Sequence, residues 1–356
     1  MKTIVSIAGA RPQFIKAFIT IKSIKRITKY KNILIHTGQH FDYRMSKIFF
    51  NELKYKKDFI KIKLKKKTSR VPRISEMINK LYFYLKKINP TLIIVYGDTD
   101  TTLAAAIVSR RLKIKLMHVE AGLRSNQINM PEEQNRYIAD FLSDYLVVPT
   151  KSSLNNLKLQ KYNKKIFNFG DVMYDSIIFY KKFINKNYIT NFKNKFGLYK
   201  KHVFLTIHRD NNSDQKIIKK ILKQILSIKL IFFWPIHPKI EKIIKKNKIK
   251  LPKNIVVTKP ISYLDTICAL KESLFVVTDS GGVQKEAYFL GKKSFVLRKE
   301  TEWHELVKAN AVKLIGNDIS KIKKNRKFIN SKILKINEFG NGNSTIKIAK
   351  LINKII

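Results

Sequence analysis

Short apolar runs alternate with longer, lysine-rich segments along the whole chain. In the first half, runs rich in β-branched residues cover positions 3–7, 33–36, 91–96, 115–119 and 145–148. These runs show little alternation of apolar and polar positions, which is typical of strands buried on both faces of a parallel sheet. The segments between them are longer and are predicted to be helices, so the pattern indicates strand–helix units repeated in order.

The same rhythm starts again after position 171, with runs at 203–207, 230–235, 255–258, 275–278 and 294–297. Strand–helix alternation twice over predicts an α/β protein with two Rossmann-like, doubly wound domains, covering 1–170 and 171–356. Gly170 interrupts the pattern at the junction, and no low-complexity linker follows it, so we expect the domains to face each other across a cleft. A last helix is predicted from about 342 to 356, after a polar Gly-Asn-Ser entry that is typical of an N-cap region.

Composition narrows the class of protein. With 356 residues, of which 44% are hydrophobic, the chain can bury two cores of ordinary size. No apolar run reaches the ~18 residues of a membrane span, and the first residues lead directly into a strand-like run. Cys268 is the single cysteine, which excludes an internal disulfide and a Cys-based zinc site. We therefore expect a cytoplasmic protein that does not bind membranes.

The formal net charge of +48 invites a nucleic-acid interpretation. The basic residues are mostly lysines spread over the whole length, however, and no nucleic-acid motif accompanies them. We interpret them as a bias in residue usage that fills solvated surfaces, so that only weak, salt-sensitive nucleic-acid binding and no specific nucleic-acid partner are expected. Between positions 98 and 136 the bias disappears: only Lys113 and Lys115 are lysines, while several of the chain's 25 acids are found there.

The acids of this spared stretch follow two predicted strands and open a helix. Asp98 comes after the run 91–96, Glu120 follows 115–119, and Glu132 and Glu133 come directly after Pro131. Ligands of open parallel sheets bind at the carboxyl ends of strands, where these side chains are expected to converge. First-turn acids also complement the helix dipole, so either glutamate alone has a structural explanation. Carboxylates gathered in a cleft indicate proton transfer at carbon or at a glycosidic oxygen.

Other strand ends carry groups suited to anions. The first strand runs into Gly9-Ala10-Arg11-Pro12-Gln13 with Lys16 one turn later, where amides and cations can meet an anion. In the second half, His208 and His237 follow strands, and each is either a functional base or a buried structural histidine. Ser280 can cap a helix whose Gly281 and Gly282 let a diphosphate approach the amides, and Glu286 can bind ribose hydroxyls. This pattern differs from the dinucleotide GxGxxG motif, which argues against NAD.

These blocks together resemble the non-hydrolysing UDP-N-acetylglucosamine 2-epimerase family over nearly the whole chain. The resemblance runs from Gly-Ala-Arg-Pro-Gln at position 9 through Gly-Asp-Thr, His-Val-Glu-Ala-Gly-Leu-Arg and Pro-Glu-Glu to Asp-Ser-Gly-Gly at 279 and Phe-Gly-Asn-Gly-Asn at 339. It implies the glycosyltransferase-B architecture of two Rossmann-like domains, a UDP-sugar substrate, and a final helix that returns to the first domain. A homodimer is also expected.

The resemblance implies a reaction without a redox cofactor or a metal. UDP is eliminated from carbon 1 as the proton leaves carbon 2, and it is added back to the 2-acetamidoglucal while a proton arrives on the opposite face. By resemblance the catalytic residues are Asp98, Glu120, Glu132 and His208. The UDP-sugar is bound by Arg11, Lys16, Ser280, Gly281, Gly282, Glu286 and Arg298. A second, regulatory UDP-GlcNAc site in bacterial relatives corresponds to Gln39, His40, Arg70 and His237.

The chain departs from the family pattern at two positions. Trp303 stands where many members have an arginine, and Gln13 replaces a common glutamate. These features are similar to a branch that includes UDP-2,3-diacetamido-2,3-dideoxyglucuronate 2-epimerases, which leaves the sugar open between that uronate and UDP-GlcNAc, the substrate we favour. The rival functions are a hydrolysing epimerase, a glycosyltransferase of the same fold and a basic nucleic-acid-binding protein.

Overall fold

The computed structural model describes residues 1–39, 58–65, 69–162 and 165–356. It divides into two compact units: Met1–Ser176 together with Asn337–Ile356, and Ile177–Ile336. The chain leaves the first unit within helix α7 (Val172–Lys181) and returns to it shortly before helix α16 (Ser344–Ile355). Among the described helices, none is long and apolar enough to cross a membrane.

The first unit is built on a parallel sheet. Within its described residues the strand order is β3-β2-β1-β4-β5-β6-β7. The strands are β1 Thr3–Ala8, β2 Lys31–His36, β3 Phe59–Lys61, β4 Leu92–Tyr96, β5 Lys115–Val119, β6 Tyr145–Val148 and β7 Lys165–Asn168. The helices are α1 Arg11–Ile27, α3 Arg70–Ile88, α4 Asp100–Arg111, α5 Pro131–Leu142 and α6 Lys151–Leu159, with α7 and α16.

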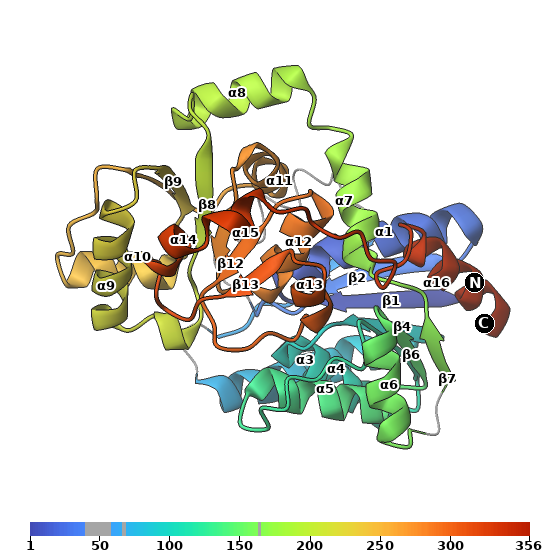
Figure 1. The fold of residues 1–356 in the computed structure, drawn as a ribbon. Coiled ribbons are helices and arrows are strands. Elements are labelled where there is room, and N and C mark those ends of the chain that lie inside the picture. Colours follow the sequence, from blue (N-terminus) through green and yellow to red (C-terminus); the bar gives the residue numbers. More distant parts are fainter. Residues whose placement is uncertain (40–57, 66–68, 163–164) are drawn as a thin grey trace. The chain divides into compact units, whose positions relative to one another are not determined.

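Helices cover both faces of this sheet. One layer contains α3, α4 and α5, whose buried residues join those of the central strands in a single apolar core. On the other face α16 packs against α1, so both chain termini lie at the same end of the unit (Figure 1). The carboxylate of Asp175 accepts the Ser344 and Thr345 amides at 3.2 and 2.7 Å. The cap of α16 therefore comes from a distant residue, whereas the local Gly-Asn-Ser entry had been expected to provide it.

The second unit repeats the architecture with a parallel sheet of strand order β10-β9-β8-β11-β12-β13 in the residues described. Its strands are β8 His202–Thr206, β9 Ile231–Pro235, β10 Ile255–Thr258, β11 Val276–Thr278, β12 Ser294–Val296 and β13 Val312–Leu314. Its helices are α8 Lys186–Phe196, α9 Gln215–Leu226, α10 Pro238–Lys246, α11 Tyr263–Glu272, α12 Gly281–Phe289, α13 His304–Lys308, α14 Lys321–Lys324 and α15 Arg326–Asn330, with a 3₁₀ turn η1 at Asp210–Asn212.

Both strand orders confirm the predicted α/β class with two Rossmann-like sheets. In each sheet the order reverses beside the first strand, between β1 and β4 in the first unit and between β8 and β11 in the second. Such switch points open a crevice at the carboxyl ends of the strands, where ligands of doubly wound folds bind. The residues that follow β1, β4, β8 and β11 are therefore the first candidates for ligand binding.

The strands that the sequence did not predict are β3, β7 and β13, and all three lie at sheet edges. Each is three or four residues long and contains an exposed lysine. An edge strand needs only one buried face, and charges on it discourage pairing with other chains. The continuous apolar run by which central strands are recognised is therefore missing at these edges.

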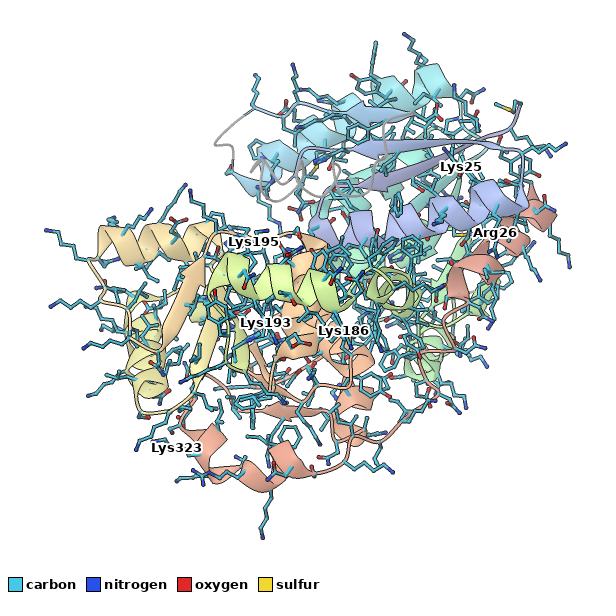
Figure 2. The ribbon with its side chains drawn as sticks, turned by 90° about the horizontal axis from the view of Figure 1, so that it is seen from above. Lys25, Arg26, Lys186, Lys193, Lys195 and Lys323 are labelled. Atoms are coloured by element: carbon cyan, nitrogen blue, oxygen red, sulfur yellow. The ribbon has the colours of Figure 1, made fainter. Side chains whose placement is uncertain are left out.

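Lysines project from the surface of both units (Figure 2). On α8, Lys193 lies 3.4 Å from the carboxylate of Glu272, and Lys195 lies 2.7 Å from that of Asp265. In both pairs the lysine is more exposed than the carboxylate, and Asp265 is buried. Part of the positive charge is therefore engaged in ion pairs within the unit that carries it.

Candidate active site

Glu120 lies at the end of β5 in a conformation that side chains rarely adopt. Its φ angle is 72°, in the left-handed region, and its carboxylate forms an ion pair with the buried Lys16 of α1. A side chain on Gly97, at the end of the neighbouring strand β4, would come within 3.1 Å of Glu120 Oε2. Strained residues cluster at functional sites because the surrounding structure must hold them there. The strand ends thus make room for this carboxylate and provide a cation beside it.

Asp98, one residue after Gly97, is held by helix α5. Arg136 Nη2 donates to Asp98 Oδ2 at 2.5 Å, and Asn135 Nδ2 donates to the Asp98 carbonyl at 2.9 Å. Arg136 also donates to the fully buried Glu133 at 2.5 Å, and that carboxylate accepts the Ser125 amide. Glu133 therefore orders the loop before α5, while Arg136 links the loop to Asp98.

Glu132 differs from its neighbour Glu133. It is half-buried at the start of α5, and no hydrogen bond or ion pair joins its carboxylate to another described residue. The helix start places the positive end of the helix dipole beside this carboxylate. Of the two adjacent glutamates, Glu133 serves the structure, and Glu132 retains a carboxylate that can act on a substrate.

The side chain of Gln13 occupies the turn between β1 and α1. Gln13 Oε1 accepts the amides of Gly9 and Ala10 at 2.8 and 3.1 Å, and Gln13 Nε2 donates to the Tyr96 carbonyl at 2.6 Å. These two amides are thus occupied, which corrects the expectation that they could meet an anion. Arg11 is half-buried at the helix start, and Lys16 forms an ion pair with Glu120.

In the second unit the corresponding strand ends are organised by one buried carboxylate, Asp279. It accepts the amides of His208 and Arg209, each at 3.0 Å, and the side chain of Asn212 at 3.1 Å. His208 Nδ1 lies 2.9 Å from Asp279 Oδ1. Burial by itself would raise the pKa of Asp279, but the His208 ring and the donated amides outweigh it and lower that pKa to about 2. The carboxylate fixes one side of the His208 ring, while 39% of the side chain remains exposed.

The N-terminus of α12 follows directly. The Ser280 hydroxyl accepts the Val283 amide at 3.4 Å, so Ser280 caps the helix as predicted. A Cβ atom on Gly281 would lie 2.0 Å from Glu302 Oε1, whereas one on Gly282 would meet nothing closer than 3.9 Å. Arg298 donates to Glu302 at 2.6 Å, and the Arg209 guanidinium lies 3.9 Å from it. The start of α12 therefore lies beside Glu302, which contacts both Arg298 and Arg209. Position 281 has no room for a side chain, because the Glu302 carboxylate occupies that space.

Trp303 and its neighbours are packed inside the second unit. Only 2% of Trp303 is exposed, and the buried Lys285 Nζ lies 3.9 Å above the centre of its ring. Glu286 of α12 is also buried. The geometry around Trp303 is that of a packed side chain, with a cation on one face of the indole.

The four positions of the candidate regulatory site fall in different places. Gln39 Oε1 accepts the Thr101 hydroxyl at 2.8 Å, and Arg70 forms a double hydrogen bond with Asp100, so both contact the start of α4. In the second unit His237 caps α10, and its ring centre is 6.1 Å from that of His208. His40 lies outside the described residues.

Sequence reasoning missed several residues that hold these groups. Asp140 was overlooked, although it is an acid in an acid-poor chain and lies seven residues after Glu133 on α5, the spacing of one helix face. Asn212 and Glu302 carried no local signal. In the residues that the structure describes, no group of three or more His, Cys, Asp or Glu side chains is arranged to bind a metal ion. The expectation of a metal-free reaction remains a prediction.

Comparison with known proteins identifies the family. A family model described as UDP-N-acetylglucosamine 2-epimerase matches residues 22–353. The chain is 41% identical over 366 positions to a UDP-N-acetylglucosamine 2-epimerase homolog of Methanococcus maripaludis, with 99% of each chain covered. It is 36% identical over 363 positions to a UDP-2,3-diacetamido-2,3-dideoxy-D-glucuronate 2-epimerase of Pseudomonas aeruginosa, again with 99% of each covered.

A solved structure is similar to the whole chain. The UDP-GlcNAc 2-epimerase of Methanocaldococcus jannaschii, in complex with UDP-GlcNAc and UDP, matches with a TM-score of 0.91 and 34% identity. The match covers 99% of this chain and 100% of that one. Taken with the strand-end acids and the glycine-rich start of α12, these similarities show that the chain belongs to the non-hydrolysing UDP-N-acetylglucosamine 2-epimerase family, with its glycosyltransferase-B-like fold.

Proposed function

We propose that the protein interconverts UDP-GlcNAc and UDP-ManNAc by eliminating and re-adding UDP, for the synthesis of surface polysaccharide precursors. The observation that carries the proposal is the set of carboxylates in the first unit. Asp98 and Glu120 follow adjacent strands, and Glu132 opens the helix that donates hydrogen bonds to Asp98. Inversion at carbon needs one group to remove a proton and another to deliver it from the opposite face.

The chemistry explains why several acids are required. Carbon 2 of the sugar is not adjacent to a carbonyl, so its proton is poorly acidic and direct deprotonation would leave an unstabilised carbanion. Loss of UDP from carbon 1 in the same step gives the neutral 2-acetamidoglucal. We assign proton transfer to Asp98, Glu120, Glu132 and His208, and we leave open which carboxylate acts on which face.

Stabilisation of the departing diphosphate falls to a second set of residues. We assign UDP binding to Ser280, Gly281, Gly282, Glu286, Arg298, Arg11 and Lys16. The capped start of α12 provides amides and the positive end of a helix dipole, and Arg298 adds a guanidinium. Donors fixed before the reaction stabilise charge as it develops, without reorganisation at the moment of bond cleavage.

The direct test is incubation with UDP-GlcNAc in deuterated water, followed by NMR. The expected result is deuterium at carbon 2 in both epimers, with UDP-ManNAc as product and no accumulation of free sugar. Free sugar with UDP would indicate a hydrolysing epimerase, and transfer of the sugar to an acceptor without exchange at carbon 2 would indicate a glycosyltransferase. Exchange without any new epimer would contradict the proposed reaction.

A second candidate substrate is UDP-2,3-diacetamido-2,3-dideoxyglucuronate, on which a relative of 36% identity is named as acting. If Trp303 contacts the sugar, this uronate should have the higher kcat/KM, and Trp303→Arg should reduce the difference. The burial of Trp303 against Lys285 favours a packing role instead. We therefore expect the ratio of kcat/KM values for the two substrates to stay unchanged in Trp303→Arg, with UDP-GlcNAc preferred.

We also propose regulation by a second UDP-GlcNAc molecule at Gln39, Arg70 and His237, together with His40. Support comes from the shared contact of Gln39 and Arg70 with the start of α4, which directly follows the turn that carries Asp98. The rate should then depend sigmoidally on UDP-GlcNAc concentration, and His237→Ala should change the shape of that curve more than UDP affinity. Hyperbolic kinetics in the wild type would contradict the regulatory role.

A homodimer in the cytoplasm is the proposed working form. Phe83 on α3 and Phe141 on α5 are 67% and 65% exposed, and both helices pack against α4. Large apolar side chains at the surface are candidates for contact with a second copy of the chain. Sedimentation of the wild type should show a dimer, and Phe83→Ser with Phe141→Ser should shift it toward monomer. A monomeric wild type at micromolar concentration would refute this proposal.

A further inference from the structure

The His118 ring in β5 is completely buried between two hydrogen-bond acceptors. Nδ1 lies 2.7 Å from Asp140 Oδ1, and Nε2 lies 2.8 Å from the carbonyl oxygen of Gly97. A carbonyl oxygen can only accept, so Nε2 must carry a proton. A neutral imidazole has one N–H, which would leave Nδ1 as an acceptor facing a carboxyl group.

The surroundings of Asp140 decide where the second proton lies. Asp140 Oδ2 accepts the Gly122 amide at 3.1 Å and Arg124 Nη1 at 2.8 Å, so the carboxyl group already faces two donors. Burial raises the pKa of Asp140, but the hydrogen bond and charge of His118, together with Arg124, outweigh it and lower that pKa. Arg124 and the Gly122 amide favour the ionised form of Asp140 independently of His118, and the second proton then lies on Nδ1, which makes His118 an imidazolium with two N–H donors.

This pair joins the three segments that carry the candidate carboxylates. The Gly97 carbonyl directly precedes Asp98, and the Gly122 amide lies two residues after Glu120. Asp140 belongs to α5, the helix whose first turn contains Glu132. Both glycines have left-handed φ angles, 63° and 78°, which a residue with a side chain rarely adopts.

We propose that the buried His118–Asp140 pair is a positioning device for Asp98, Glu120 and Glu132, and that His118 performs this role as a doubly protonated imidazolium. The positioning role rests on the proposed epimerase function, whereas the protonation state does not. The imidazolium is the form that can hold the β4 turn and the α5 carboxylate at once. Loss of either bond releases one carboxylate-bearing turn from the other two segments.

Other groups around the pair are consistent with this charge state. The Arg124 guanidinium lies 4.2 Å from the centre of the Tyr137 ring and donates to Gln160 at 2.7 Å. The hydroxyl group of Tyr162 also faces this cluster, and burial together with the charge of Asp140 raises its pKa, so that it remains neutral. Asp140 is thus the carboxylate that both the Arg124 guanidinium and the His118 ring contact.

The protonation state is tested by NMR of the histidine rings in the wild-type protein. Comparison with His118→Gln assigns the His118 signals among the seven histidines of the chain. At about pH 8, where a free imidazole has lost one proton, both His118 nitrogens should show ¹⁵N shifts of the protonated type and slowly exchanging N–H signals. An unprotonated nitrogen in the His118 ring would overturn the imidazolium assignment.

The positioning role is tested by kinetics. His118→Asn retains a donor near the position of Nδ1, and His118→Gln retains one near Nε2, so each should lose one of the two bonds. Both variants should lower kcat about 10²-fold, the cost of small misplacements in an active site, with KM and UDP affinity within about twofold of wild type. The double variant His118→Gln/Asp140→Asn should lose no more than the larger single loss.

The control is His202→Gln, a buried histidine of the second unit that donates to the Ala269 carbonyl and should leave kcat unchanged. Equal losses in kcat and UDP affinity, or wild-type kcat in either His118 variant, would overturn the positioning role. Failure of all His118 variants to fold, with His202→Gln folded, would show a purely structural role and also overturn it. An inactive wild type with the expected NMR signals would instead contradict the proposed function alone.

Discussion

The two units place polar groups at the same topological position but organise them in opposite ways. At the ends of β4 and β5 the carboxylates of Asp98 and Glu120 form ion pairs with cations from neighbouring helices, Arg136 of α5 and Lys16 of α1. At the ends of β8 and β11 the carboxylate of Asp279 is buried, and it holds backbone amides and the His208 ring around itself.

The same architecture therefore holds polar groups at its strand ends in two different ways. The first unit leaves the Asp98 side chain partly exposed and pairs both Asp98 and Glu120 with cations, an arrangement that suits proton transfer. The second unit buries its acid and presents a capped helix start, Arg209 and Arg298, which suits an anion. If this division is correct, variants of the first unit should affect turnover, and variants of the second should affect nucleotide affinity.

The largest effect is expected from the acids of the first unit. Asp98→Asn and Glu132→Gln remove a group that gives or takes a proton, and each should reduce kcat ~10²–10⁴-fold. UDP affinity, measured by calorimetry, should stay largely unchanged. The surface variant Glu241→Gln, which breaks only a pair with Lys245, serves as the control. More than half of the wild-type rate in either acid variant would remove that residue from the catalytic set.

Acid should weaken the second unit before the first. Burial lowers the pKa of His202 from 6.5 to about 4, although its bond to the Ala269 carbonyl opposes the shift. Between pH 6.5 and about 4, His202 is therefore protonated in the unfolded chain but neutral in the folded one. The free energy of unfolding falls as the pH drops through this range. In His202→Gln this loss should be smaller by about 3 kcal/mol, from roughly 1.4 kcal/mol per pKa unit.

Denaturant unfolding curves at several pH values across this window measure the difference. Below a pH of about 4 the wild type and His202→Gln should lose stability in parallel, because His202 is then protonated in both the folded and the unfolded wild-type chain. Parallel curves throughout the window would show that His202 does not titrate in this way.

A smaller effect is expected at the start of α12. The Cβ atom of Gly281→Ala would lie 2.0 Å from Glu302 Oε1, so Glu302 must move, at a cost of about 1–3 kcal/mol of stability. Gly282→Ala meets no protein atom closer than 3.9 Å and should melt like the wild type. Weaker UDP binding in both variants, with destabilisation only in Gly281→Ala, would support close approach of the diphosphate. Unchanged UDP affinity in Gly282→Ala would count against that approach.

No effect is expected from chelators. Activity should persist in EDTA and without added nicotinamide, because the proposed reaction uses carboxylates as acids and bases. Loss of activity in EDTA with recovery on addition of a divalent ion would mean that some of these carboxylates serve as metal ligands.

More of the fold than of the candidate site could be predicted from the sequence. Every apolar run assigned as a strand is a strand, within one or two residues at the ends, because all of them except β10 are central strands, which must be apolar on both faces. Asp98, Glu120 and His208 were named as candidates because they closely follow such strands. Asp140 and Glu302 were not, because they act through side chains that approach from other elements. Gln13 was noted only as a replacement, whereas in the structure it fills the β1–α1 turn.

The sequence by itself determined the α/β class, the order of the central strands along the chain and the strand ends that carry the candidate residues. These properties follow from local patterns, since burial on two faces and glycine or proline turns can be recognised within a few residues. Tertiary structure alone decided the partners: Arg136 for Asp98, Asp140 for His118, and Asp175 for a helix start 169 residues away. A hydrogen bond between distant residues depends on how the whole sheet brings them together, and no local pattern specifies it.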